Sequence, residues 1–271
     1  MAGQRTTEIT RACLRTVRAA ARKAGPWLLI LWAAIAAARA DEPQSAPPDV
    51  PSVETFDISF DFSHNGVHAA IMDRSLRAGE DGTYVIETRS HTDGWVSIFL
   101  KDRIVERSVW TFHDGRPRPL RYEYHRTGGF KERHIVQDFD WQKLEVAESR
   151  NGKTRRVQIP ADALDKLLYQ YVMMLDLQAG RRNFTYTYVD RGRVRTLAFE
   201  RLGHENVKTP FGDLDTIRLA IVDDKRPTTV WCAPAYDYLP VRLTQQDGDA
   251  DMEMVVRSIQ RARRVQPADG D

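Results

Sequence analysis

Residues 160–175 read PADALDKLLYQYVMML, a stretch with a helical period between two long runs of alternating, strand-like segments. Its large apolar side chains recur at i, i+3, i+4, i+7, i+8 and i+11, on one face of a helix: Leu164, Leu167, Leu168, Tyr171, Val172 and Leu175. Burying six such side chains is worth about 10 kcal/mol, at roughly 1.5 to 3 kcal/mol each. The pattern predicts one helix, at about 161–179, that packs on a sheet.

The same stretch carries signals for both ends of this helix. Asp162 is expected to accept a hydrogen bond from a free N–H group of the first turn, and Asp165 adds favourable negative charge there. Gly180, followed by Arg181 and Arg182, is the predicted stop.

Segments of alternating apolar and polar residues precede and follow the helix, and the first of them places four side chains on one face: Phe56, Ile58, Phe60 and Phe62. Turn pairs such as Asn65-Gly66 and Asn151-Gly152 separate the segments at about ten-residue spacing, as in antiparallel hairpins. Roughly a dozen strands and one helix predict a mainly β fold. We expect an antiparallel meander that forms a strongly curved sheet or open barrel, with the helix packed on it. Two half-sheets meeting at the helix are the alternative.

The first forty residues have the pattern of a secretory signal peptide. A basic segment precedes the apolar run Trp27–Ala38, and Ala38 and Ala40 occupy the minus three and minus one positions of a cleavage site. As a helix this run spans about 18 Å, less than the roughly 30 Å hydrocarbon core of a membrane. We therefore expect cleavage after Ala40, export to the periplasm and no stable membrane span after cleavage.

The rest of the chain divides by composition. Residues 41–53 are rich in proline and acid and predict a flexible linker, 54–260 predict a single β-rich domain, and 261–271 predict a frayed tail. The 40 basic and 38 acidic residues of the whole chain include seven and one, respectively, in residues 1–40, so the mature chain has net charge −4. Its basic residues are interleaved with acids, so we expect no nucleic-acid partner.

Residues with catalytic potential form no familiar motif. Cys232 is the only cysteine after cleavage, and we interpret it as a buried thiol that packs as a small hydrophobe; the alternative is a nucleophile whose base comes from elsewhere in the fold. His64 and His68 have the i, i+4 spacing of a metal site on a helix, but Asn65-Gly66 breaks any helix there. We therefore expect no metal, no cofactor and no enzyme activity.

The aromatic residues are more informative. Several lie in or beside strand-like runs, where most belong to a core, yet the concave face of a curved sheet can also hold an apolar pocket. The candidate ligand-binding residues are Trp95, Trp110, Tyr122, Trp141, Tyr186 and Trp231.

Several stretches resemble one known family. Residues 209–217 (TPFGDLDTI), 228–231 (TTVW) and 238–242 (YLPVR) are similar to the ending of the bacterial envelope family of domain of unknown function 3108. The stretch GRPRPLRY at 115–122 and the helix resemble its middle, so the likeness spans about 54–260. The resemblance implies a periplasmic, mostly antiparallel β protein and assigns no activity to single residues.

These observations favour a periplasmic, non-enzymatic binding module for an apolar or amphiphilic cell-envelope molecule, such as a lipid. Two alternatives stay open. One is a structural or interaction protein of the envelope that pairs with a protein partner, and the other is an unrecognised hydrolase. The sequence indicates no oligomeric state.

The first prediction concerns processing of the N-terminus. Protein recovered from an osmotic-shock fraction is expected to have the intact mass of residues 41–271, because the short apolar run ends in a cleavage site. Recovery of a membrane-bound species that still carries residues 1–40 contradicts this expectation.

Overall fold

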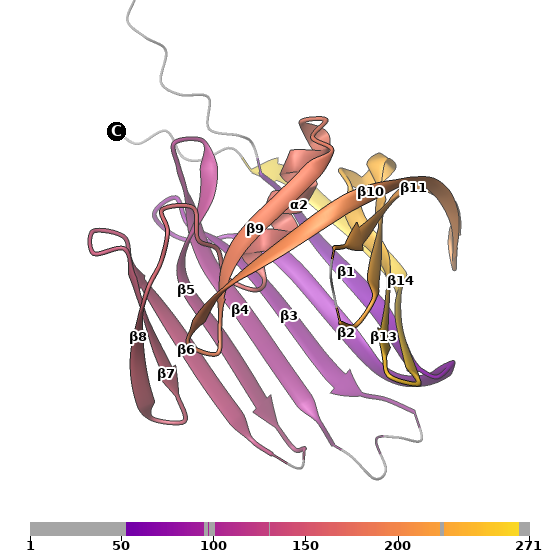
Figure 1. The fold of residues 1–271 in the computed structure, drawn as a ribbon. Helices are drawn as coiled ribbons and strands as arrows, with labels where there is room; N and C mark the ends of the chain where they lie inside the picture. The colour runs from indigo at the N-terminus through magenta and orange to yellow at the C-terminus, as the bar shows by residue number, and fades with distance from the viewer. Residues whose placement is uncertain (1–52, 95–96, 98–100, 130, 223–224, 266–271) are drawn as a thin grey trace, which may run out of the picture. The chain divides into compact units, whose positions relative to one another are not determined.

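The computed structural model describes residues 53–94, 97, 101–129, 131–222 and 225–265, without the side chains of 262–265 (Figure 1). The predicted signal peptide with Ala38 and Ala40, residues 41–52 of the predicted linker, Trp95 and residues 266–271 lie outside the described residues. Among the helices of the described residues, none combines the length and apolar character that a membrane crossing requires.

The described chain forms two antiparallel meanders joined by a helix. The first meander consists of β1 (Val53–His64), β2 (Val67–Ala78), β3 (Tyr84–Thr92), β4 (Arg103–His113), β5 (Arg116–Thr127), β6 (Arg133–Asp140), β7 (Glu145–Arg150) and β8 (Lys153–Gln158). After helix α2 (Leu168–Gln178), the second meander consists of β9 (Asn183–Asp190), β10 (Arg193–Thr209), β11 (Gly212–Ile221), β12 (Thr228–Ala233), the 3-10 helix η1 (Pro234–Tyr236), β13 (Leu239–Asp247) and β14 (Ala250–Val265).

The first and last strands pair and fuse the meanders into one sheet of fourteen strands, in the order β8 to β1 and then β14 to β9. The β1–β14 register runs from Val53 opposite Val265 to His64 opposite Met252, with two irregularities that bend the pair. In the described chain β8 and β9 are the free edges, so the sheet does not close into a barrel. The predicted mainly β meander with a curved sheet and one packed helix is confirmed.

Helix α2 lies inside the curve of this sheet, in contact with β5 on one side and β9 on the other (Figure 1). Seven of its eleven residues are buried. Trp110 of β4 stacks on Tyr84 with ring centroids 4.7 Å apart, and lies 5.1 Å from the ring of Tyr171 on the helix. These rings join β3, β4 and α2 into one core, because each lies on the inward face of its element.

The helix begins at Leu168, seven residues after the predicted start at 161. The prediction of Asp162 as the cap is wrong, because Asp165 Oδ1 accepts hydrogen bonds from the backbone N–H groups of Leu167 and Leu168, both at 2.8 Å. The segment before the helix pairs with β9 instead of forming helical turns: the N–H of Leu164 donates to the carbonyl of Thr187 in β9, at 2.8 Å. Pairing with a strand edge therefore displaces the first helical turns.

The predicted stop is confirmed. Gly180 follows the last helical residues with φ of +73°, a conformation that costs glycine little. Its N–H donates to the carbonyl of Leu177 at 3.0 Å, and the N–H of Arg181 donates to that of Asp176 at 3.0 Å.

Asp165 also ties the start of the helix to the sheet. It is fully buried, and Ser108 of β4 donates its hydroxyl to Asp165 Oδ2 at 2.5 Å. Burial raises the pKa of Asp165 to about 6, although the hydrogen bonds from Ser108, Leu168 and Leu167 oppose the rise. At neutral pH this cap is therefore a buried carboxylate whose ionisation costs stability.

The second prediction concerns the pH dependence of stability. Because the folded-state pKa of Asp165 is raised above its unfolded value, the folded protein binds an additional proton between about pH 6 and pH 4. Lowering the pH from 7 to 4 should therefore stabilise wild type relative to Asp165→Asn by about 2 to 3 kcal/mol. Urea unfolding of both proteins across this range measures the difference.

The exposed Asp162, in the same stretch, supplies the matched control. The Asp162→Asn variant should keep the pH profile of wild type. A pH-independent difference between wild type and Asp165→Asn, or one that falls as the pH is lowered, contradicts the assignment.

Candidate functional site

Two pockets flank helix α2. The first, which we call the apolar crevice, is a hollow of about 300 Å³ between α2, β1 and the start of β13. Its apolar walls are Phe56, Tyr171, Met174, Leu175 and Leu239. Three of these residues belong to the helix, so the helix forms one whole wall.

The apolar crevice continues into the interior as a narrow cavity of about 10 Å³. Phe56, Tyr171, Met174 and Leu239 line both parts, and the inner part also reaches Arg74. The two parts therefore follow the helix, from the domain surface toward the half-buried guanidinium of Arg74.

Polar groups surround the outer mouth of the apolar crevice. Arg261 lies 3.2 Å from carboxylate oxygens of both Glu54 and Asp237, and its guanidinium is 5.1 Å from the ring centroid of Tyr236. Gln178, at the end of α2, donates to the carbonyl of Asp237 at 3.1 Å. The pocket thus combines apolar walls with a charged, hydrogen-bonded rim, which suits an amphiphilic ligand.

The rim includes a strained turn between η1 and β13. Asp237 and Tyr238 have φ of 52° and 59°, the left-handed region that costs a residue other than glycine roughly 1 to 2 kcal/mol. The N–H of Tyr238 donates to the carbonyl of Ala233 at 2.9 Å and holds this turn in place. The turn directs Tyr236 and Leu239 to the crevice, since both line it.

Arg74 anchors a polar cluster at the inner end. Its Nε donates to Thr88 Oγ1 at 3.0 Å and its Nη1 to Gln170 Oε1 of the helix at 2.7 Å. Burial lowers the pKa of Arg74, and the nearby Glu106 carboxylate opposes that change. Glu106 in turn accepts a hydrogen bond from the Tyr122 hydroxyl at 2.6 Å.

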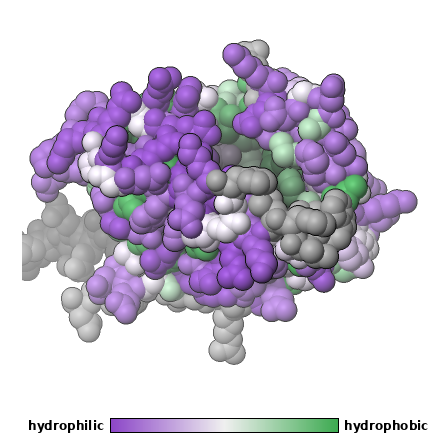
Figure 2. Space-filling view, turned by 90° about the horizontal axis from the view of Figure 1, so that it is seen from below, coloured by the Kyte–Doolittle hydropathy of each residue, from purple (hydrophilic) through white to green (hydrophobic). Residues whose placement is uncertain are grey.

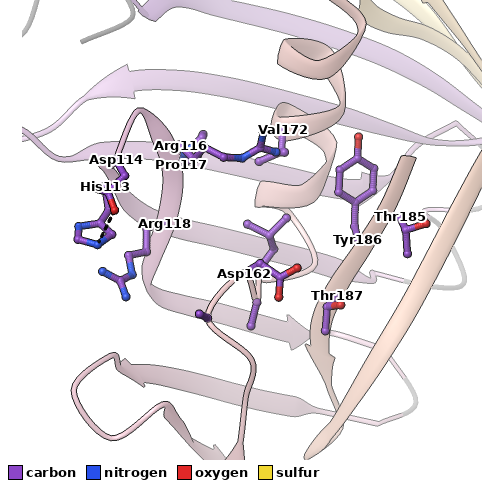
Figure 3. A pocket seen from close by; sticks show the side chains of 13 residues that line it. His113, Asp114, Arg116, Pro117, Arg118, Asp162, Val172, Thr185, Tyr186 and Thr187 are labelled. Atoms are coloured by element: carbon purple, nitrogen blue, oxygen red, sulfur yellow. Dashed lines mark ion pairs between the residues drawn. The ribbon is translucent and has the colours of Figure 1, made fainter. Parts of the chain in front are cut away.

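The second pocket, which we call the polar pocket, lies between the β4–β5 hairpin, residues 161–164 and β9 (Figure 3). It encloses about 240 Å³. Its lining includes eight residues with ionic, imidazole or hydroxyl groups: His113, Asp114, Arg116, Arg118, Asp162, Thr185, Tyr186 and Thr187. Buried Asp176 joins two of these groups, because it lies 3.3 Å from Arg116 and accepts a hydrogen bond from the Tyr186 hydroxyl at 3.0 Å.

A further hollow is visible on the face shown in Figure 2. Figure 2 shows hydrophobic side chains at the bottom of a depression that polar side chains surround. Hydrophilic residues cover most of the rest of this face.

The structure does not bring the predicted aromatic residues into one site. Trp110 and Tyr122 are in the core, Trp231 packs beneath Arg242, Trp141 packs beneath Arg118, and Tyr186 lines the polar pocket. None of these five lines the apolar crevice. Ligand binding by these residues stays a prediction.

Sequence reasoning missed most residues of the crevice. Met174 lies off the helical face that the spacing predicts, and Leu239 lies in a stretch noted only for its family resemblance. Two sequence signals were available: Met173-Met174 extends the apolar surface of the helix beyond one face, and Pro240 marks the start of a strand.

The family described as protein of unknown function (DUF3108) matches residues 55–255. The chain belongs to this family. A solved structure titled as a beta-barrel-like protein of domain of unknown function DUF1849, from Brucella abortus, is similar with a TM-score of 0.51 and 10% sequence identity. The match covers 78% of this DUF3108 chain and 99% of that chain, and at this identity it shows a shared beta-barrel-like fold alone. No curated protein matches the sequence.

Two features of the described residues bear on the catalytic alternatives for this DUF3108 protein. Within the described residues, no three His, Cys, Asp or Glu side chains gather where they could hold a metal ion. Cys232 is a free, fully buried thiol in β12, so its interpretation as a buried thiol is confirmed. Burial raises the pKa of the Cys232 thiol, which opposes formation of the nucleophilic thiolate.

The third prediction concerns the reactivity of Cys232. At neutral pH the native protein should react with iodoacetamide far more slowly than the urea-unfolded protein, because the thiol is buried and protonated. Mass spectrometry of timed, quenched samples measures both rates. Cys232→Ala controls for labelling elsewhere, and rapid labelling of the native protein contradicts the prediction.

Proposed function

We propose that this protein is a periplasmic, non-enzymatic binding module for an amphiphilic cell-envelope molecule whose apolar chain enters the apolar crevice. The observation that carries the proposal is the crevice itself, with apolar walls from α2, β1 and β13 and a charged rim. Its volume of about 300 Å³ lies at the lower end of the range for small-molecule sites. Export rests on the signal-peptide pattern of residues 1–40.

The crevice suits an apolar chain for two reasons. Transfer of an apolar chain from water to walls such as Phe56, Met174 and Leu239 gains roughly 25 cal/mol per Å² of buried surface. The rim supplies a guanidinium at Arg261 and an amide at Gln178, which can face a polar headgroup. The narrow inner part ends at the half-buried Arg74, so a long chain must displace side chains to reach further.

An interaction protein could pair with its partner through an open strand edge, and each edge of this sheet has a feature that opposes strand addition. The free edge β8 carries Lys153, Arg155 and Arg156, charged residues that discourage pairing with another chain. Leu164 already pairs with part of the β9 edge. These observations favour the binding module over an interaction protein that pairs through its strands.

The fourth prediction tests the crevice directly. Protein purified without detergent should carry a lipid-sized adduct in native mass spectrometry. Added short-chain phosphatidylglycerol should raise the melting temperature of adduct-free protein, since a ligand at a hundred times its dissociation constant stabilises by about 2.7 kcal/mol. Leu175→Trp fills the mouth of the crevice from a half-buried position and should reduce both effects.

Leu202→Trp is the matched control, because Leu202 lies on β10, is 44% exposed and does not line the crevice. It should bind lipid as wild type does. Absence of an adduct together with an unchanged melting temperature overturns the proposal. So does equal lipid binding by the Leu175→Trp protein.

A further inference from the structure

Three arginines of the domain stack on aromatic rings, and two of them also contact carboxylates. The guanidinium–ring distances are 4.2, 4.7 and 5.1 Å for Arg118 on Trp141, Arg242 on Trp231 and Arg261 on Tyr236. The Arg242 Nε donates to Glu253 at 2.7 Å, and Arg261 is paired with Glu54 and Asp237. Each of these two cations thus has a ring on one side and an oxyanion within hydrogen-bond distance.

Arg118 has the ring without the oxyanion. Its Nε is buried and has no hydrogen-bond partner, and among the described residues no carboxylate forms an ion pair with it. The ring beneath it is fixed, because Trp141 Nε1 donates to the carbonyl of Pro119 at 2.8 Å. A buried guanidinium N–H with no acceptor is costly, so an acceptor supplied from outside the chain would gain free energy here.

The polar pocket gives such an acceptor access to Arg118. Arg118 lines this cavity of about 240 Å³, whose opposite wall is formed by residues 161–164 and β9 (Figure 3). In Figure 3 the side chain of Arg118 lies beside the β4–β5 hairpin, and the carboxylate of Asp162 lies on the opposite side, toward Thr187. Arg118 is therefore separated from the acidic group on the far wall.

We propose that the polar pocket binds a small molecule through one oxyanion group, a phosphate or a carboxylate, held by Arg118. Nε and one terminal NH₂ of the guanidinium donate to two oxygens of the ligand, as a planar fork suited to such groups. The oxyanion of the ligand accepts a hydrogen bond from Arg118 Nε, as the carboxylate of Glu253 does from Arg242 Nε.

The surrounding charges limit the ligand to a single anionic group. Arg116 also lines the pocket, but Asp176 already pairs with it at 3.3 Å, and His113 lies 3.4 Å from Asp114. Asp114 and Asp162 add negative charge at the pocket, which disfavours polyanions. The site does not depend on the apolar crevice, because it shares no lining residue with it.

The fifth prediction tests Arg118 with two simple probes. Inorganic phosphate and acetate are titrated separately into ¹⁵N-labelled protein at constant ionic strength, and arginine Nε–H signals are followed by NMR. The signal lost in Arg118→Lys identifies Arg118, and it should shift saturably with at least one probe. Arg118→Lys keeps the charge but loses the fork, so its affinity, followed through the backbone amide signals that shift in wild type, should fall about tenfold or more.

Arg242→Lys is the matched control, because Arg242 has the same ring contact but is already paired. It should bind the probe as wild type does. Saturation by phosphate alone assigns a phosphate ligand, and saturation by acetate alone assigns a carboxylate ligand. Saturation by both probes shows that the site recognises either oxyanion. Failure of both probes to saturate, or an unchanged affinity in Arg118→Lys, overturns the proposal.

A second variant tests the effect of the negative charge that the pocket itself carries. Asp162→Asn removes a negative charge from the exposed side of the pocket and should tighten binding of the anionic probe. Weaker binding by this variant contradicts the proposed site. Thermal unfolding of each variant confirms that the fold is intact before affinities are compared.

Discussion

Burial of helix α2 is the constraint on which the rest of the structure depends. Seven of its eleven residues are buried, and a flat sheet can cover only one side of a helix. The sheet therefore has to curve around it, and pairing of β1 with β14 makes one continuous sheet long enough to do so. Asp165 ties the start of the helix to Ser108, and Asp176 ties its end to Arg116 and Tyr186.

The same arrangement explains why both pockets adjoin the helix. A straight helix and a curved sheet cannot be in contact along their whole length, so space remains where the sheet curves away from the helix. On one side the space becomes the apolar crevice, beside β1 and β13, and on the other the polar pocket, beside β5 and β9. The segment before the helix limits the polar pocket, because Ala161 to Leu164 line it while Leu164 pairs with the β9 edge.

Three charged side chains tie helix α2 and the segment before it to the sheet. The buried Asp165 and Asp176 and the half-buried Arg74 are each held by hydrogen bonds or an ion pair, as charges removed from water generally require. Each of the three also bonds a residue on another element, so they position the helix inside the sheet. Arg118 differs in that its buried Nε lacks an acceptor. The first three charges therefore have a structural role, whereas we propose that Arg118 binds a ligand.

The sequence alone determined the class of fold, because period-two alternation and Asx-Gly turns such as Asn65-Gly66 act locally. It also determined the existence of the helix and its end at Gly180. It did not determine the start of the helix, where pairing of Leu164 with β9 prevailed over the local preference for helix. Nor did it determine the pairing of β1 with β14, which joins the two ends of the domain.

The sites depended on tertiary structure for the same reason. An inward-facing aromatic residue such as Trp110 and a crevice residue such as Phe56 share one alternating pattern, so only the curvature of the sheet decides which of them meets another side chain and which lines a cavity.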